Sequence, residues 1–326
     1  MPEVTLVEAV NLALAHEMQA DKNVVVFGED VGVNGGVFRA TAGLQKRFGK
    51  ERVMDTPLAE TLIAGMAIGM AAQGLRPVSE VQFMGFIYPT IDQMLNHASR
   101  LRYRTRGRLT CPMVLRAPFG GGIHAPEHHS ESTESLFAHI PGLRVVIPSS
   151  PARAYGLLLA AIRDPDPVVF LEPKRIYRLL KQDLPDNGEA LPLDVCFVLR
   201  EGSDVTAVTW GAMTHETLQA AEQLASDGIS VEVIDVATIK PLDMETILES
   251  VAKTGRCVIV HEAARTAGMG AEIAAQLAER GLLTLLAPVQ RVTGYDTVMP
   301  LYKLENEYMP DTARIVAGIR KTMEMA

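Results

Sequence analysis

Three of the eight histidines fall within one short glycine-rich segment, GGGIHAPEHHSES, between Gly120 and Ser132. Histidine is the side chain best suited to proton transfer near neutral pH. His124 and His128 stand four residues apart, a spacing that brings two metal ligands onto one face of a helix. Pro126 lies between them and disfavours a continuous helix. The pattern therefore argues against a transition-metal site and leaves a catalytic loop and a polar turn as open alternatives.

The strand predicted before this segment favours the catalytic alternative. CPMVLRAPFG is an apolar run that ends at a glycine directly before the histidines. In open α/β sheets, ligands bind beyond the carboxyl ends of the strands. We therefore expect the loop to lie where a ligand would bind.

Glu60 is a second candidate, because it enters a helix that otherwise consists of small and apolar residues, DTPLAETLIAGMAIGMAAQG. An acid at a helix N-terminus interacts favourably with the helix dipole, and this explanation needs no function. A carboxyl in apolar surroundings can also be held partly protonated, as an acid that shares a proton with a ligand nitrogen must be. Both interpretations remain open from the residues alone.

Two glycine-containing segments resemble phosphate-binding motifs but have the wrong spacing. GLQKRFGKE has one residue too many between its glycines, and Glu51 replaces the Ser or Thr that binds magnesium in a Walker loop. GMGAEIAAQ lacks the third glycine of the dinucleotide fingerprint. We therefore predict that this chain has no phosphate-binding loop of either kind.

Helical and strand patterns alternate along most of the chain, which predicts an α/β protein with parallel sheets covered on both faces. The alternation stops after Arg178, where prolines, acids and glycine gather, and it resumes with DVTAVTWG. We predict one domain over residues 1–180, a linker over 181–202 and a second domain over 203–326. One helix is expected over YPTIDQMLNHASRLRYR.

Composition restricts the class of protein. The chain has 326 residues and a net charge of −8 without any dense run of Lys or Arg, which argues against binding nucleic acid or an anionic membrane. The sequence has no apolar run of the ~18 residues that a spanning helix needs, and no signal-peptide pattern, so a cytoplasmic location is expected. Cys111, Cys196 and Cys257 are widely spaced in apolar contexts and are predicted to be buried thiols.

Several long motifs occur in one order: FGEDVGVNGGVFRAT, DTPLAET, EVQFMGFIYPTIDQM, RAPFGGGIHAPEHHSES and PGLRVVIPS. Together they resemble the β subunits of the thiamine-dependent decarboxylating component of 2-oxo acid dehydrogenase complexes. The similarity covers nearly the whole chain and is greatest to bacterial members that act on pyruvate. Relatives act on branched-chain 2-oxo acids or acetoin.

The resemblance implies a thiamine pyrimidine-binding domain followed by a transketolase-like C-terminal domain. It also implies an α2β2 heterotetramer, in which the α subunit holds the diphosphate of thiamine diphosphate through Mg²⁺ with a GDG…NN motif. This sequence contains no GDG, so the chain is expected to form half of each active site. The C-terminal domain is expected to pair subunits and to dock the dihydrolipoyl acyltransferase core. Within it, His261 and Glu262 are predicted to be structural or interfacial.

Residue roles are carried over by matching positions. Glu60 matches the glutamate that bonds to the aminopyrimidine, Phe86 the aromatic residue that packs on that ring, and Gln82 lies in the same motif. Burial in the core is the alternative for Phe86. His129 matches a histidine that assists acyl transfer to the lipoyl group, and His124 is a secondary candidate. His128 is expected to lie outside the chemistry.

The segment AAIRDPDP matches a potassium loop of relatives. The carbonyl ligands would come from Ala161, Asp164 and Asp166, with Cys111 and Met113 on the neighbouring strand. A helix end followed by a turn is the alternative interpretation.

Three other functions remain to be compared with a pyruvate-specific β subunit. One is a β subunit for branched-chain 2-oxo acids or acetoin, and substrate preference would distinguish it. Another is a noncatalytic assembly subunit, which the presence of both Glu60 and His129 disfavours. The third is a dinucleotide oxidoreductase, which the incomplete glycine fingerprint disfavours.

Overall fold

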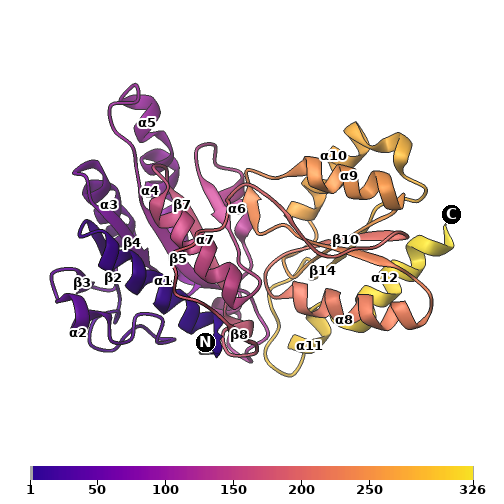
Figure 1. Cartoon of the computed structure of the whole chain (residues 1–326), viewed down its shortest axis with the longest axis horizontal. Coiled ribbons are helices and arrows are strands. Elements are labelled where there is room, and N and C mark those ends of the chain that lie inside the picture. The colour runs from indigo at the N-terminus through magenta and orange to yellow at the C-terminus, as the bar shows by residue number, and fades with distance from the viewer. Residues whose placement is uncertain (1–2, 326) are drawn as a thin grey trace. The chain divides into compact units, whose positions relative to one another are not determined.

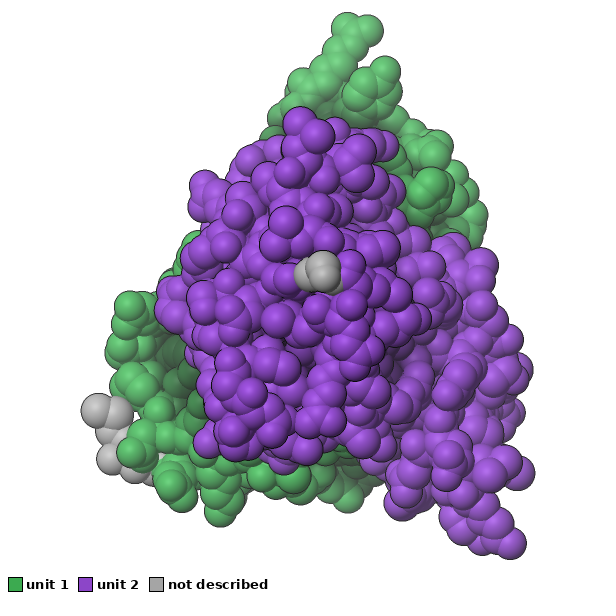
Figure 2. All heavy atoms as spheres, turned by 90° about the vertical axis from the view of Figure 1, so that its right-hand side faces the viewer, with its two compact units in different colours: residues 1–119, 136–193 green, residues 120–135, 194–326 purple. Residues whose placement is uncertain are grey.

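Short runs of β-branched and apolar residues form the centres of two sheets, one in each half of the chain. The structure, a computed structural model, describes residues 3–325 and divides into two units. Unit 1 comprises residues 1–119 and 136–193, and unit 2 comprises residues 120–135 and 194–326 (Figure 2). The loop with three histidines thus groups with unit 2, although the chain on either side of it belongs to unit 1.

The sheet of unit 1 consists of parallel strands in the order β6-β7-β5-β4-β2-β3. Every residue of β5 and β7 is buried, as expected for central strands covered on both faces. The strands are β2 (Val24–Gly28), β3 (Val53–Asp55), β4 (Arg76–Glu80), β5 (Val114–Phe119), β6 (Arg144–Val146) and β7 (Val168–Pro173).

Helices α1 and α7 lie side by side in unit 1 (Figure 1). α1 begins with a capping box in which Thr5 and Glu8 bind each other's backbone, and this fixes the first turn. β1 (Glu3–Thr5), directly before α1, pairs antiparallel with β8 (Lys181–Asp183), which follows β7 in the chain. The helices are α1 (Leu6–Ala20), α2 (Leu44–Phe48), α3 (Glu60–Ala72), α4 (Ile91–Asn96), α5 (Leu101–Arg104) and α7 (Pro151–Arg163), and α6 (Glu134–Ala138) crosses from unit 2 into unit 1.

The sheet of unit 2 has the order β14-β13-β10-β11-β9, and only its edge strand β9 (Phe197–Arg200) runs antiparallel to its neighbour. Helices α8 and α12 contact each other in this unit. The other strands of this sheet are β10 (Val205–Thr209), β11 (Val231–Asp235), β13 (Cys257–His261) and β14 (Gln290–Thr293), and the short strand β12 (Thr238–Lys240) lies outside it. The helices are α8 (Met213–Ser226), α9 (Met244–Thr254), α10 (Met269–Arg280), α11 (Glu305–Tyr308) and α12 (Thr312–Glu324).

The predicted α/β class with parallel sheets is confirmed, but one predicted helix is wrong. The segment YPTIDQMLNHASRLRYR is broken at His97, where the backbone leaves the helical region (φ −124°, ψ −62°), and a 3-10 turn separates α4 from α5. Nearby, the Ser99 hydroxyl donates to the Leu95 carbonyl at 2.9 Å, a side-chain bond of the kind that bends helices. The spacing of apolar residues does not reveal such local hydrogen bonds between side chain and backbone.

The predicted linker over residues 181–202 contains two short strands, β8 and β9, and its other residues form neither helix nor strand. Strands of three or four residues are too short for periodicity to detect. Cys111 and Cys257 are buried as predicted, whereas Cys196 is only partly buried. The domain bounds 1–180 and 203–326 stay predictions. Within residues 3–325, no helix combines the length and apolarity needed to cross a membrane.

Candidate active site

The carboxyl ends of β2, β3 and β4 meet at one edge of the unit 1 sheet, because these strands are parallel neighbours. β2 and β4 approach each other closely at this edge. A Cβ atom on Gly28 would lie 2.4 Å from the carbonyl oxygen of Glu80, so only glycine fits there. The residues that follow these strand ends are therefore brought together.

Two glutamates lie at this edge. Glu60 is the first residue of α3 and is half-buried, and its negative charge is favourable at a helix N-terminus. Glu29, directly after β2, is only 7% exposed, and its Oε1 has no hydrogen-bond partner within residues 3–325. Burial raises the pKa of Glu29, and the nearby charges of Glu60 and Asp30 raise it further. The pair can therefore hold a proton that two isolated glutamates would lose.

Gln82 and Phe86 follow β4. The Gln82 amide lies 3.4 Å from Oδ2 of Asp30, a long contact that leaves the amide able to bind another group. Phe86 is half-buried and makes an edge-to-face contact with Phe83, with ring centroids 5.9 Å apart. The 3-10 turn that follows is held to α3 by a hydrogen bond from the Thr61 hydroxyl to the Pro89 carbonyl at 3.0 Å.

A buried ionic network lies on the neighbouring strands. Arg116 of β5 donates to both carboxylate oxygens of Glu172, at 2.6 and 3.0 Å, and to Glu80 at 2.9 Å. The Tyr177 hydroxyl also donates to Glu172, at 2.6 Å. Burial raises the pKa of Glu80, although Arg116 opposes that shift. With every member satisfied, the network holds three adjacent strand ends in fixed positions.

The histidine loop in unit 2 has the interrupted backbone that the sequence predicts. Pro126 is extended, and a single 3-10 turn over Glu127–His129 follows it, so no helix joins His124 to His128. The Ser130 hydroxyl donates to the Pro126 carbonyl at 3.1 Å. His129 is half-buried at the end of the turn, whereas His128 is exposed.

Two buried glutamates hold the glycine portion of this loop. Oε2 of Glu262 accepts a hydrogen bond from the Gly121 amide at 3.2 Å. Glu305, 1% exposed, accepts from the Gly122 amide at 2.8 Å and from the His124 amide at 2.9 Å. The His124 imidazole also pairs with Glu305, at 2.8 Å. Successive backbone amides thus bind carboxylates, as they do in anion-binding nests.

The glycines make this arrangement possible. Gly120 has φ +87°, and a Cβ atom there would lie 2.4 Å from Oε1 of Glu262. A Cβ atom on Gly121 would lie 2.4 Å from the methyl group of Met299. Any larger residue would push the loop away from the side chains that hold it.

Glu134 closes the segment and is fully buried. Burial raises the pKa of its carboxyl to about 8, and the charge of Glu262 adds to the shift. His261, which precedes Glu262 in the chain, is buried and stacks on Trp210, with ring centroids 5.1 Å apart. Burial lowers the pKa of His261 to about 4, so this histidine is neutral at physiological pH. These properties agree with the structural role predicted for His261.

The sequence predicts a potassium site formed by AAIRDPDP and by the segment that contains Cys111 and Met113, and the structure places these two segments side by side. The Cys111 amide donates to the Pro165 carbonyl at 3.1 Å. Both aspartate carboxylates are already engaged with arginines, Asp164 with Arg144 at 3.1 Å and Asp166 with Arg102 at 2.8 Å. Burial raises the pKa of the Cys111 thiol to about 12, so it stays protonated.

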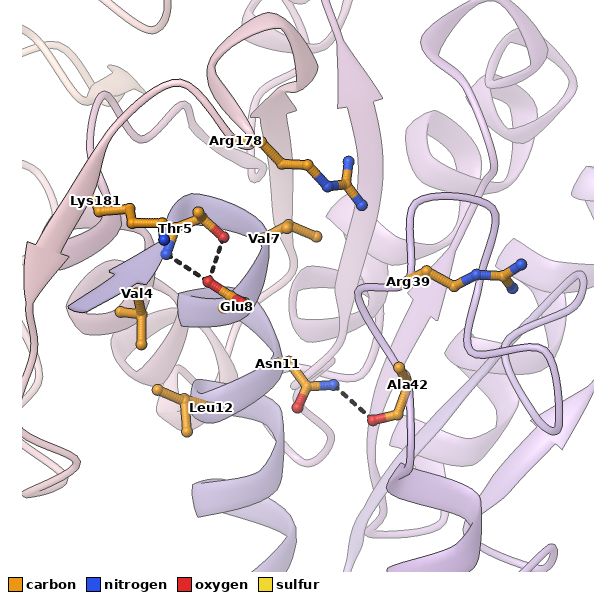
Figure 3. Close-up of a pocket in the computed structure, with 10 residues that line it drawn as sticks. All are labelled: Val4, Thr5, Val7, Glu8, Asn11, Leu12, Arg39, Ala42, Arg178 and Lys181. Carbon is orange, nitrogen blue, oxygen red and sulfur yellow. Dashed lines mark hydrogen bonds between the residues drawn. The ribbon is translucent and has the colours of Figure 1, made fainter. Parts of the chain in front are cut away.

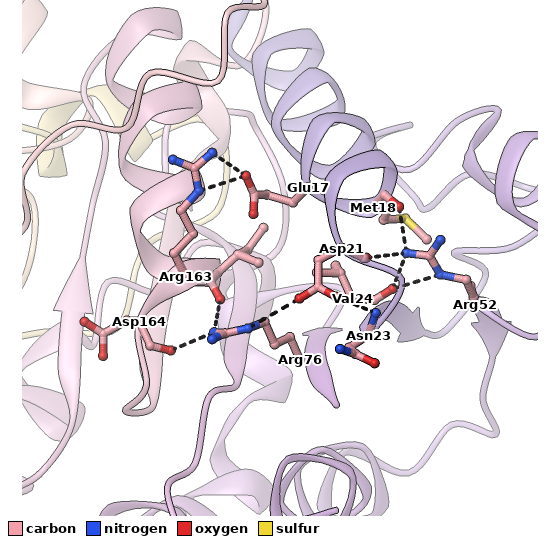
Figure 4. A network of polar contacts seen from close by, with 10 residues as sticks. Glu17, Met18, Asp21, Asn23, Val24, Arg52, Arg76, Arg163 and Asp164 are labelled. Carbon is pink, nitrogen blue, oxygen red and sulfur yellow. Dashed lines mark hydrogen bonds and ion pairs between the residues drawn. The ribbon is translucent and has the colours of Figure 1, made fainter. Parts of the chain in front are cut away.

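Arginines also bind the carbonyls near this segment (Figure 4). Arg76 donates to the carbonyl oxygens of Ile162, at 2.9 Å, and Asp164, at 3.3 Å. The Met113 carbonyl accepts from the Val168 amide at 3.0 Å. No group of three or more His, Cys, Asp or Glu side chains within residues 3–325 could hold a metal ion. A cation here would depend on carbonyl oxygens that accept a second interaction.

A pocket in unit 1 contains none of the predicted site residues (Figure 3). Its volume is about 650 Å³, and it lies beside the first turns of α1. The carboxylate of Glu8 points to Thr5, from which it accepts two hydrogen bonds, at 2.7 and 2.8 Å. Three cations line the rest of the pocket: Arg39, Arg178 and Lys181. It therefore lacks the free acid and amide groups that the strand-end site provides.

The structure brings Glu60 and Gln82 to one strand edge, with Phe86 on the segment that continues from Gln82. His124 and His129 belong to unit 2. Sequence reasoning missed Glu29 and Glu305. The rule that ligands bind beyond the carboxyl ends of strands could have identified Glu29 in FGED. No local pattern marks Glu305, because its partners are 181 and 183 residues away in the chain.

Comparisons with known proteins define the class first. The family "Transketolase, pyrimidine binding domain" matches residues 2–179, and "Transketolase, C-terminal domain" matches residues 196–315. A solved structure titled "Split gene transketolase, inactive beta4 tetramer" has a TM-score of 0.82 and 24% identity, covers 99% of both chains, and is similar in fold.

Curated relatives narrow the class. The pyruvate dehydrogenase E1 component subunit beta of Bacillus subtilis (strain 168) is 50% identical, over 99% of this chain and 100% of the relative. Its counterparts in Staphylococcus epidermidis and Staphylococcus aureus are 48% identical over the same shares. The chain therefore belongs to the family of pyruvate dehydrogenase E1 component β subunits.

Proposed function

We propose that the chain is the β subunit of a thiamine diphosphate-dependent pyruvate dehydrogenase, which decarboxylates pyruvate oxidatively and acylates the lipoyl group of the acyltransferase core. The observation that carries this proposal is the pair formed by Glu29 and Glu60 beyond the strand ends, with a raised pKa on Glu29. Full-length identity of 50% to a pyruvate dehydrogenase β subunit supports the choice of pyruvate.

The groups at the strand edge fit an aminopyrimidine, whose edge carries both hydrogen-bond donors and acceptors. Glu29 Oε1 has no partner within the described chain, and Glu60 is accessible. Bound thiamine diphosphate would supply the nucleophilic carbon and take up the electrons released on decarboxylation. Glu60 would exchange a proton with the ring nitrogen, while Gln82 and Phe86 would orient the ring.

The diphosphate and its Mg²⁺ would belong to the α subunit, since neither glycine motif of this chain has the spacing of a phosphate-binding loop. The expected assembly is an α2β2 heterotetramer. Support for partners comes from large apolar side chains that unit 2 exposes, which mark interaction surfaces: Leu282, Leu283, Leu286, Val298, Leu301 and Leu304. The acyltransferase core would dock on the same unit.

His129 would assist proton transfer when the acyl group passes to the lipoyl disulfide. Its position at the end of a loop held by Glu262 and Glu305 supports this role, because a catalytic group needs fixed supporting contacts. His124 would act indirectly through its ion pair with Glu305. His128, which is exposed, would take no part.

Potassium would bind to carbonyl oxygens of Cys111, Met113, Ala161, Asp164 and Asp166. The contact between Cys111 and Pro165 supports this arrangement, since it brings the two segments together. Replacing potassium by lithium in the buffer should lower the melting temperature of the assembled enzyme, whereas replacing chloride by another anion should not. An identical melting temperature in both cations would rule the site out.

The test is 2-oxo-acid-dependent reduction of an artificial electron acceptor by the chain recovered with its native partner, in thiamine diphosphate and magnesium. Pyruvate, branched-chain 2-oxo acids and acetoin are compared, and the preferred substrate identifies the complex. Activity that requires the partner would support the proposal. No turnover of any substrate by a complex with bound cofactor would favour a noncatalytic assembly subunit.

A further inference from the structure

Three arginines line one small pocket in unit 2: Arg265, Arg291 and Arg314. The pocket has a volume of about 150 Å³, and its other lining residues are Thr293, Gly294, Tyr295 and Asp296. Arg291 lies on β14, Arg314 on α12, and Arg265 in the segment after β13. Three separate parts of the chain thus each contribute a cation to the same cavity.

Each guanidinium group is held in place by the backbone. Arg265 donates to the Arg291 carbonyl at 3.3 Å, and Arg291 donates to the Arg265 carbonyl at 3.0 Å. Arg314 donates to the Tyr308 carbonyl at 2.9 Å and to the Thr293 carbonyl, and its guanidinium carbon lies 4.8 Å from the centroid of the Tyr295 ring. The cations are positioned before any ligand arrives, which lowers the entropy that binding must overcome.

Within residues 3–325, none of the three arginines forms a close ion pair with a carboxylate, unlike Arg320, which pairs with Asp227 at 2.7 Å. Asp296, the acidic residue of the pocket, accepts hydrogen bonds from the Thr266 amide and hydroxyl, both at 2.8 Å. Burial and the repulsive charge of Arg265 lower the pKa of Arg291, although the charge of Asp296 opposes that shift. This happens in a chain with 39 acidic and 31 basic residues.

We propose that this arginine pocket binds a small oxyanion, a free phosphate or carboxylate or the same group on a small metabolite. Guanidinium groups bind both chemical types through paired N–H donors. The volume is about five times the ~30 Å³ that a water molecule occupies in the liquid, so one oxyanion group fits and a nucleotide does not. An anion would relieve the repulsion between Arg265 and Arg291. The site is separate from the Glu60 chemistry and does not depend on the proposed function.

The experiment uses the full chain in its complex with the native partner, in buffer without phosphate and at constant ionic strength. Inorganic phosphate and acetate are titrated separately by calorimetry, with chloride as the reference anion. Arg265→Gln and Arg291→Gln remove one cation each, and Arg265→Gln is the safer variant because Arg265 is exposed. Arg320→Gln is the matched control, since that exposed arginine lies in the same unit outside the pocket.

We expect saturable binding of at least one anion that weakens about tenfold or more in both pocket variants and is unchanged in Arg320→Gln. Stronger binding of phosphate than of acetate would identify a phosphate-bearing ligand, and the reverse order a carboxylate-bearing one. Equal affinity in all variants would overturn the proposal, as would the absence of saturable binding. Binding by the isolated chain that disappears in the complex would also overturn it, because a partner group would then fill the pocket.

Discussion

In unit 1, Glu29 lies at a strand edge near Glu60, its Oε1 has no hydrogen-bond partner within residues 3–325, and burial and the charge of Glu60 raise its pKa. In unit 2, the carboxylates of Glu262 and Glu305 accept hydrogen bonds from the amides of Gly121, Gly122 and His124. The residue type is the same, but the supply of donors differs. The buried glutamate whose Oε1 lacks a donor can hold and exchange a proton, whereas the two that accept from backbone amides fix the position of the loop.

The largest effect is expected for Glu60→Gln. The amide keeps the size of the side chain but cannot exchange a proton, so turnover should fall by about 10²–10⁴-fold, the usual contribution of a general acid or base. The free energy of unfolding should fall by no more than about 0.3–1 kcal/mol, the usual contribution of a favourable charge at a helix N-terminus. Steady-state turnover and calorimetric melting are the measurements. Retention of full activity would remove Glu60 from the mechanism.

Glu29→Gln should have a smaller effect on rate and a characteristic effect on pH dependence. Burial and the charges of Glu60 and Asp30 raise the pKa of Glu29, and the glutamine removes this titrating carboxyl. The acid limb of the turnover profile, to which a carboxyl of raised pKa contributes, should therefore move to lower pH, with turnover reduced about tenfold. Profiles of the parent, of Glu29→Gln and of the exposed control Glu51→Gln would be compared. An unchanged acid limb would show that Glu29 does not contribute to the pH dependence of turnover.

Glu305→Gln tests the contacts that hold the histidine loop of unit 2. Glutamine carries no charge and has one oxygen, so it can accept from only one of the Gly122 and His124 amides, and its NH2 group faces the other. The loop should therefore open more often, with hydrogen exchange of residues 120–130 about tenfold faster. Lipoyl acylation should fall more than reduction of an artificial acceptor, because the proposed role of His129 is in acyl transfer. The neighbouring exposed Glu307→Gln is the control. Equal losses in both assays would indicate a general structural defect instead.

The smallest effect on activity is expected for Glu134→Gln, which changes the pH dependence of stability. The pKa of Glu134 is raised from 4.5 to about 8 in the folded chain, so the folded state binds this proton more tightly than the unfolded state does. Its contribution to the free energy of unfolding is therefore greatest below pH 4.5 and declines as the pH rises to about 8. In Glu134→Gln the decline between these values should be shallower.

Urea unfolding at pH 5 and pH 8 would measure this decline in the parent and in Glu134→Gln. The exposed Glu127→Gln provides the control, because it lies in the same loop and should leave the slope unchanged. If the free energy of unfolding changes by the same amount between pH 5 and pH 8 in the parent and in Glu134→Gln, the raised pKa of Glu134 is contradicted.

The sequence predicts the parts of the molecule that depend on periodic burial. Strands such as β5 and β7 are mostly apolar and follow from the sequence, as does the interruption at Pro126. The break at His97 was not, because a serine hydroxyl bonded to the helix backbone leaves the apolar pattern unchanged.

The residues of the candidate site also differ in how far the sequence alone can predict them. Glu60 stands out because its helix is otherwise apolar, and Glu29 could have been found from its place after a strand. Glu305 could not, because α11 has only four residues and its contacts are set by the tertiary structure. Motif resemblance supplied the role of His129, and no physical property of that residue in the sequence distinguishes it from His128.

Residues 120–135 group with unit 2 although they sit between two stretches of unit 1. A fragment that stops at residue 193 would include this loop but lose Glu262 and Glu305, the side chains that hold it. A fragment that starts at residue 194 would keep those glutamates without the amides they bind. Exchanging one half of this chain for that of a relative therefore requires two grafts, with the loop and the C-terminal half taken from the same parent.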